Sequence, residues 1–139
     1  AGPIVDELLR LLSVVQVAFP RFAKEDVEVA GRHVPKGSVV LVSLPAVNRD
    51  PRSTSGDDID LAHASSSHLA FGYGFHRCVG AELARLELRI AFPRLVRRFP
   101  ELALAVEPET PAFRAKSIVY AVDSLPVHLG GVSRSSNVS

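Results

Sequence analysis

The sequence feature that most constrains this chain is the stretch from Phe71 to Gly80, which holds the only cysteine and leads directly into the strongest predicted helix. Beyond Gly80, apolar residues recur at helical spacing, at positions 84, 88, 91, 95 and 99, so we predict a helix that ends near Phe99. Cys78 then lies at a helix N-terminus, where unpaired amide groups and the helix dipole stabilise a thiolate over a thiol. A thiolate in this position is a candidate metal ligand.

The other residues of the stretch suit a flat, apolar ligand. Three glycines permit tight turns and let a ligand approach the backbone closely, and Phe71 and Phe75 supply apolar walls. A lone cysteine is, however, usually a small buried hydrophobic residue. A zinc site is a further interpretation, and its four candidate ligands are His63, His68, His76 and Cys78. That site gives the glycines and phenylalanines no role, and the sequence lacks the further cysteines of an iron–sulfur cluster and the Cys-x-x-Cys-His motif of covalent heme attachment.

The pattern Phe-Gly-x-Gly-x-His-x-Cys-x-Gly at 71 to 80 resembles, at every fixed position, the heme-binding loop of the cytochrome P450 family, the heme-thiolate monooxygenases. Residues 81–87 are similar to the family's helix behind that loop. By this resemblance Cys78 is the axial ligand of the heme iron and His76 binds a heme propionate. The resemblance also implies heme b as the cofactor and assigns three more loop residues to the heme-binding set, Phe71, Gly72 and Gly80.

Two segments before the loop extend the resemblance. Glu7 and Arg10 are three residues apart on a predicted helix near the N-terminus, so they share one face and can pair. Such a pair is by itself usually solvated, but these residues resemble the family's Glu-x-x-Arg pair, which implies a structural role behind the heme. Arg21 stands where the family has an arginine that binds the other heme propionate, and the alternative is an exposed charge on a strand.

Two apolar segments resemble the parts of the family that contact substrate. One contains Val17 and Ala18, and the other, near the end of the chain, contains Ile118 and Val119. Their apolar character implies an apolar small-molecule substrate, although apolar strand residues are normally core. The resemblance also implies that electrons come from a ferredoxin or a reductase, and that a thiolate-ligated iron inserts one oxygen atom from dioxygen into the substrate.

One loop departs from the family pattern. Between Arg52 and Asp58 the sequence is about one residue shorter than the family pattern, and Asp58 stands where many members have an arginine that completes a network with Glu7 and Arg10. We therefore expect an acid near Glu7 and the loss of one of its partners. The candidates to replace the missing arginine are Arg49, Arg52 and His63.

The predicted fold is mainly α-helical with small antiparallel sheets, as in the C-terminal part of the cytochrome P450 fold. The first helix is apolar nearly all round, and we expect its apolar residues to be buried, namely Ile4, Val5, Leu8, Leu9, Leu11 and Leu12. Strands are predicted at 14–19, 27–29, 39–42 and 102–106, with a closing hairpin formed by 113–122 and 124–129. We expect residues 1–129 to form the heme-binding portion and 130–139 to be a disordered tail.

Charge and composition narrow the function further. The 16 basic and 15 acidic residues are spread along the chain, so no basic face for nucleic acid is predicted. One cysteine excludes an internal disulfide, and without a signal peptide or a long apolar run we expect a reducing, cytoplasmic setting with no membrane span. The chain has no methionine, and the resemblance covers roughly the last third of a family member, so we expect a piece of a longer protein.

The family's long distal helix, whose acid and threonine deliver protons to dioxygen, has no counterpart in the sequence. We therefore expect no catalytic residue within these 139 residues and no turnover by the chain alone. A truncated, non-catalytic heme-binding remnant is the alternative function, and an α+β domain without heme is the alternative to heme binding altogether.

Overall fold

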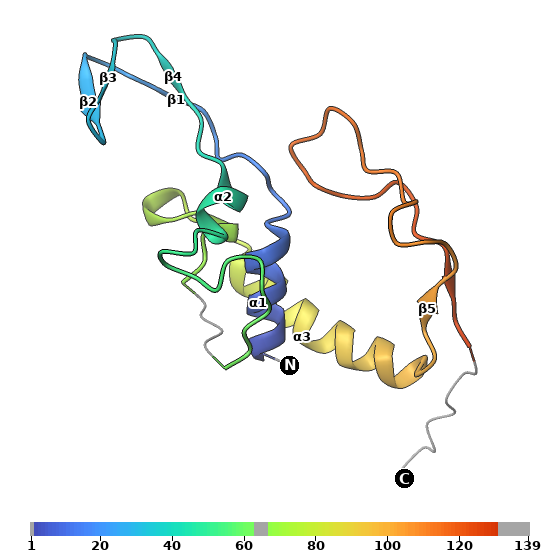
Figure 1. The fold of residues 1–139 in the computed structure, drawn as a ribbon. Coiled ribbons are helices and arrows are strands. Elements are labelled where there is room, and N and C mark those ends of the chain that lie inside the picture. The colour runs from blue at the N-terminus through green and yellow to red at the C-terminus, as the bar shows by residue number, and fades with distance from the viewer. Residues whose placement is uncertain (1, 63–66, 131–139) are drawn as a thin grey trace.

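The computed structural model describes residues 2–62 and 67–130. Its helices lie at the centre of the molecule, with a β-hairpin extending to one side and the chain around β5 to the other (Figure 1). The helices are α1 (Gly2–Leu12), α2 (Leu44–Asn48) and α3 (Ala81–Arg98), and two short 3-10 turns are η1 (Leu69–Phe71) and η2 (Gly74–His76). Helix α1 contacts α2, α3 and η1, so it is the element around which the others pack. None of the helices in the described ranges has the length and apolar character needed to cross a bilayer.

Six short strands form three separate two-stranded antiparallel sheets in the described ranges. The pairs are β1 (Arg21–Phe22) with β4 (Val39–Val40), β2 (Val27–Val29) with β3 (Arg32–Val34), and β5 (Ala103–Leu104) with β6 (Val127–His128). The predicted strands at 27–29, 39–42 and 102–106 are therefore present, although shorter than two of those ranges.

The predicted strand at 14–19 is wrong, because this segment changes partners too often to form a regular ladder. It makes only isolated bridges, from Val15 to Val119 and from Val17 to Ser43. The hydrogen bonds show the change: the Gln16 amide donates to the Ile118 carbonyl, whereas the Ala18 amide donates to the Val42 carbonyl.

The closing hairpin was also predicted with the wrong pairing. Residues 127–128 pair with β5 instead of with 113–122. The 113–122 segment folds back on itself through a bridge from Phe113 to Val122. Within it the rings of Phe113 and Tyr120 are stacked, with centroids 4.3 Å apart. The predicted tail at 130–139 lies, beyond Gly130, outside the described residues.

The interior carries fewer apolar side chains than the sequence predicted. Of the six apolar residues expected to be buried on α1, only Val5 is, while Ile4 and Leu12 are 44% and 48% exposed. The buried face of α1 instead presents three charged residues, Asp6, Glu7 and Arg10. On α3 the buried residues are Ala81 and Arg85. Charged side chains occupy these faces because they pair with one another across elements.

Candidate functional site

The loop that carries Cys78 is closed by its own backbone. The Gly72 amide donates to the Leu69 carbonyl at 2.9 Å, and Gly72 has a φ of +74°, a conformation that residues with a Cβ rarely adopt. The Cys78 amide donates to the Phe71 carbonyl at 2.8 Å, and the Ala81 amide donates to the Cys78 carbonyl at 3.3 Å. Cys78 is thus fixed at the base of the loop, immediately before α3, as the sequence predicted.

The Cys78 thiol is free and exposed, so the interpretation of Cys78 as a buried core residue is wrong. Tyr73 is also exposed, and Phe75 and Val79 are fully so. A Cβ added at Gly80 would lie 3.9 Å from the sulfur, an ordinary van der Waals distance, so Gly80 lies beside the thiol. An exposed soft ligand surrounded by apolar side chains suits the iron of a flat, apolar cofactor such as heme.

The zinc interpretation finds no matching geometry in the described ranges. Residues 2–62 and 67–130 contain no group of three or more His, Cys, Asp and Glu side chains placed to hold a metal ion. His68 is directed instead at a charged cluster described below, and His63 lies outside the described residues. A single sulfur donor fits the axial position of heme better than a tetrahedral zinc site.

The two predicted propionate ligands, His76 and Arg21, are both exposed. His76 ends η2, two residues before Cys78, and Arg21 begins β1, where it pairs with Val40. Within the part of the chain that the structure describes, neither side chain has a hydrogen-bond or ion-pair partner. Both are therefore available to an external anionic group. Phe71 is half-buried, with the Arg85 guanidinium 5.0 Å from its ring centroid.

Glu7 and Arg10 pair as their spacing predicts, but the pair is buried. Arg10 Nε and Nη2 donate to the two Glu7 carboxylate oxygens at 3.0 Å and 2.7 Å, and the side chains are only 6% and 3% exposed. The hydrogen bonds from Arg10 are the largest cause of a lowered pKa of Glu7. The pair is therefore charged and held in a bidentate geometry, which is stronger and more directional than a solvated pair.

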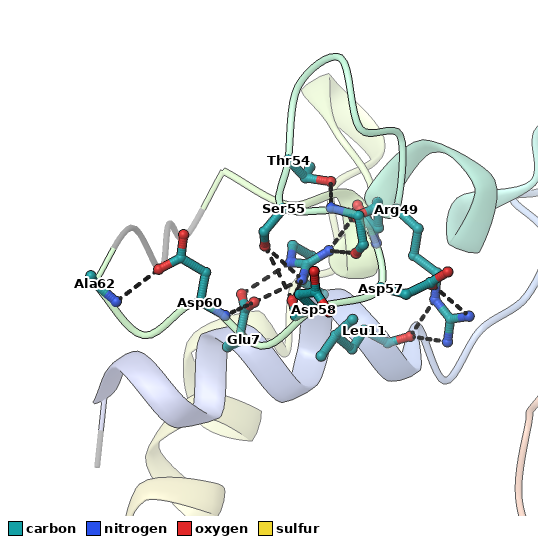
Figure 2. Close-up of polar contacts among 12 residues, drawn as sticks. Glu7, Leu11, Arg49, Thr54, Ser55, Asp57, Asp58, Asp60 and Ala62 are labelled. Atoms are coloured by element: carbon teal, nitrogen blue, oxygen red, sulfur yellow. Dashed lines mark hydrogen bonds and ion pairs between the residues drawn. The ribbon is translucent and has the colours of Figure 1, made fainter.

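The loop that departs from the family pattern closes over Arg10. Arg10 donates to the main-chain carbonyls of Gly56 and Asp58, at 2.6 Å and 2.8 Å, and to the Ser55 hydroxyl at 3.1 Å. It also donates to the Asn48 carbonyl at 2.8 Å. Figure 2 shows Ser55 and Asp58 reaching toward Glu7 from this loop.

The expected effect of Asp58 on Glu7 is not what the structure shows. Asp58 is exposed and contributes its main-chain carbonyl to Arg10. Glu7 gains a different second partner, the Asp60 amide, which donates to its carboxylate at 2.9 Å (Figure 2).

Two of the three residues predicted to replace the missing arginine, Arg49 and Arg52, do not do so. Arg49 donates to the Leu11 carbonyl and pairs with Asp57, as Figure 2 shows, and Arg52 pairs with Asp50 at the surface. The third candidate, His63, lies outside the described residues. The backbone of the 55–60 loop therefore supplies the bonds around this pair.

A second charged cluster, behind the Cys78 loop, was missed from the sequence. Arg85 of α3 donates to the Asp6 carboxylate of α1 at 2.8 Å, and Arg89 donates to its other oxygen at 3.2 Å. His68 Nε2 lies 3.8 Å from the same carboxylate. Burial raises the pKa of Asp6, but the hydrogen bonds and charges of Arg85 and Arg89 outweigh it and leave the pKa below its ordinary value of 3.8.

Asn48, also missed from the sequence, joins the two regions. Its side chain is 2% exposed, donates to the Ser13 hydroxyl at 2.7 Å and accepts from the Leu69 amide at 2.6 Å. Its main-chain carbonyl accepts from Arg10. Asn48 therefore connects the Glu7–Arg10 pair with the first residue of η1, at the start of the Cys78 loop.

The two segments predicted to contact substrate run side by side. The segment with Val17 and Ala18 meets the segment with Ile118 and Val119 through the hydrogen bond from the Gln16 amide to the Ile118 carbonyl, at 2.9 Å. Ile118 is 60% exposed. The structure thus brings together two apolar segments that are about a hundred residues apart in the sequence.

Comparison with known proteins extends this description. A family model described as Cytochrome P450 matches residues 3–53 and 57–121 of the chain. Cytochrome P450-SU2 of Streptomyces griseolus is 46% identical over 124 residues, which are 88% of this chain and 31% of that protein. Nocardicin C N-oxygenase of Nocardia uniformis subsp. tsuyamanensis is 47% identical over 125 residues, with 88% and 31% covered.

Solved structures agree with the sequence comparison. The structure of the tirandamycin C-bound P450 monooxygenase TamI matches with a TM-score of 0.87 at 39% identity, over 92% of this chain and 32% of that one. The predicted fold class is therefore confirmed. The chain spans 31% to 32% of the length of these relatives. Residues 54–56, outside the family match, lie in the loop that closes over Arg10.

Proposed function

This chain belongs to the cytochrome P450 family, and we propose that its Cys78 is the axial thiolate ligand of a heme iron. The observation that carries the proposal is an exposed thiol at the base of a closed loop, in front of α3 and among exposed apolar side chains. The family implies a heme-iron cofactor, and we propose heme b because a non-covalent heme needs no second cysteine. Residues 1–129 would form its heme-binding portion.

The proposed contacts to the rest of the heme follow from the exposed residues around the loop. His76 and Arg21, which have no side-chain partner in the described ranges, would bind the two propionates by charge-assisted hydrogen bonds. Gly72 and Gly80 would let the ring approach the backbone, and Phe71 would line it. These residues hold and orient the cofactor.

The proposed reaction of the complete protein is insertion of one oxygen atom from dioxygen into an apolar small molecule. Heme iron with a thiolate ligand supplies this chemistry, because the thiolate donates electron density that favours cleavage of the O–O bond. In this chain, Val17, Ala18, Ile118 and Val119 would offer the substrate an apolar surface. We propose that a ferredoxin or a reductase supplies the electrons. We propose a cytoplasmic setting, since the single cysteine of the chain cannot form an internal disulfide.

Heme titration of this chain, with Cys78→Ser as the matched control, tests the proposal. We expect the reduced, carbon monoxide-bound protein to give the Soret band of a thiolate-ligated heme, and Cys78→Ser to lose that band. Circular dichroism should show equal helix content in the two proteins. Equal heme spectra for both would refute the role of Cys78, and no heme uptake by either would refute the proposal that residues 1–129 form a heme-binding portion.

A non-catalytic heme-binding remnant is the second candidate. It is favoured by the exposure of Cys78, Phe75 and Val79, which would leave one face of a bound ring open to water. To distinguish the two candidates, the heme-loaded chain is mixed with a chemical reductant other than dithionite, dioxygen and an apolar test substrate. The amount of oxygenated product is then measured. Product that depends on Cys78 would exclude the remnant.

A further inference from the structure

His68 is the histidine that the proposed heme site does not use, and its side chain is only 1% exposed. Its Nδ1 accepts a hydrogen bond from the Ala70 amide at 3.2 Å, which caps the first turn of η1. The neutral ring therefore carries its hydrogen on Nε2. Burial is the main cause of a lowered pKa of His68, and the charge of Arg85 lowers it further, so the ring is neutral near pH 7.

The other ring nitrogen of His68 faces the cluster between α1 and α3. Nε2 lies 3.8 Å from Asp6 Oδ1 and 3.5 Å from Arg85 Nη2. Asp6 is in turn fixed by Arg85 and Arg89. One imidazole thus lies between the backbone of the Cys78 loop and the Asp6 carboxylate, toward which its Nε2–H is directed and to which Arg85 also donates.

Phe71 continues this chain of contacts to the thiol. Its ring centroid is 6.0 Å from that of His68 and 5.0 Å from the Arg85 guanidinium carbon. Its carbonyl accepts the Cys78 amide at 2.8 Å. A desolvated cation–π contact of this kind favours one ring position over others. The orientation of Phe71 therefore affects where the Cys78 backbone is held.

We propose that His68 is a positioning residue for Cys78, which it holds through the Ala70 amide, the Phe71 ring and the Asp6–Arg85 pair. The inference rests on the proposed role of Cys78 as iron ligand. It requires both ring nitrogens, since one bonds the loop and the other faces the helices. Asparagine can reproduce the Nδ1 contact but not the Nε2 contact, and alanine can reproduce neither.

Amide hydrogen exchange of Cys78, measured by NMR in the chain without heme, tests this role. In His68→Ala we expect the Cys78 amide to exchange about tenfold faster, while amides in the middle of α3 change less than about twofold. His68→Asn should recover part of the protection, to within about threefold of the wild-type rate. His33→Asn is the matched control, because His33 is an exposed residue of β3, and it should leave Cys78 unchanged.

Three results would overturn the inference. They are an unchanged Cys78 rate in His68→Ala, an equal acceleration of the Cys78 and α3 amides, and a His68→Asn rate no slower than that of His68→Ala. If His68→Ala does not fold, Phe71→Leu replaces it, since leucine removes the aromatic face and its contact with Arg85 but leaves the hydrogen bond between Arg85 and Asp6 in place. Selective acceleration at Cys78 in that variant and in His68→Asn would support the inference, and its absence would refute it.

The measurement separates this inference from the proposed function. Exchange is followed without heme, so a chain that fails to bind heme still shows whether His68 holds Cys78. Where heme binds, the carbon monoxide spectrum gives a second readout: His68→Ala should lose part of the thiolate-type band, and His68→Asn should recover it. A full band in all three proteins, with unchanged exchange, would leave the heme proposal intact and refute the positioning role.

Discussion

The interface between α1 and α3 and the surface around Cys78 show opposite distributions of side chains. The interface buries charge, in Asp6 and Arg85, whereas the surface exposes apolar groups, in Phe75 and Val79. Buried charge contributes little net stability, but where every group is satisfied it specifies one geometry. Exposed apolar surface is costly in water and marks a place where another apolar group binds. The comparison indicates that the buried charged residues fix the position of the Cys78 loop. The exposed apolar side chains of this loop then contact the apolar group that binds there.

The buried charges are all satisfied, as this interpretation requires. Among residues 2–62 and 67–130, no buried side-chain nitrogen or oxygen lacks a hydrogen-bond partner. The fully buried apolar residues in the same ranges are only Val5, Leu44 and Ala81. The apolar core is small, and every buried polar group around it is paired. We therefore expect the loss of a single member of this network to lower stability, because it leaves a charge or a donor unpaired.

The largest effect is expected from Arg10→Met, which breaks the interior side of the comparison. This substitution keeps much of the side-chain volume but leaves the Glu7 carboxylate buried without its cation. We expect the free energy of unfolding to fall by about 3–5 kcal/mol, measured by urea titration. Arg52→Met is the matched control. Arg52 is exposed and lowers the pKa of the half-buried Asp50 to about 2, and its loss should leave the urea midpoint unchanged.

Asn48→Ala should have a smaller effect on the same region. It removes the acceptor of the Leu69 amide and the donor to the Ser13 hydroxyl, at a site that is 2% exposed. We expect a loss of about 1–3 kcal/mol in unfolding free energy. Amide exchange should show that Leu69 loses protection before α3 does. Equal loss of protection at both sites would mean that Asn48 does not specifically hold the loop.

The pH dependence of the free energy of unfolding tests the interior side of the comparison, because the groups whose pKa values are shifted lie in the interior. Burial and Arg85, with a smaller contribution from Arg10, lower the pKa of folded His68, against the opposing effect of Asp6. The unfolded state therefore binds more protons below the ordinary pKa of 6.5, and stability falls as the pH falls through that value. The lowered pKa values of Asp6 and Glu7 cause a further loss below about pH 4.

Urea titrations at a series of pH values measure this dependence. In His68→Asn the first loss, between about pH 7 and 5.5, should disappear, while the acid loss remains. His33→Asn should keep both. A wild-type stability that is flat across the first range would contradict the buried, neutral His68.

The sequence predicted the parts of the site that depend on local spacing. The turn before α3, the closed loop and the Glu7–Arg10 pair involve residues close in the chain, where glycine chemistry and helical periodicity determine the geometry. It failed for the Asp6–Arg85 pair, whose members are 79 residues apart. No periodicity relates them, and the apolar residues of α1 did not indicate that three charged residues of this helix are buried.

Strand pairing was the other limit of prediction from the sequence. The β-branched residues of 14–19 predicted an extended segment but not its partners, and the segment bonds first to 118–120 and then to 42–43. For the same reason the predicted partner of residues 127–128 was wrong, since these residues pair with β5. Short strands contain too few side chains to specify a partner, so the pairing depends on where the helices place each segment.

The smallest effect on stability is expected from Phe75→Ser, which changes the surface side of the comparison. Phe75 is fully exposed, so the free energy of unfolding should stay within about 0.5 kcal/mol of wild type. If Phe75 covers heme, however, its apolar surface is buried on binding, and we expect heme affinity to fall about tenfold, measured by titration. Phe19→Ser is the matched control, since Phe19 is also exposed and lies outside the Cys78 loop. An equal loss of heme affinity in both variants would show that the effect is not specific to the loop surface, whereas a loss confined to Phe75 would show that its exposure serves the ligand.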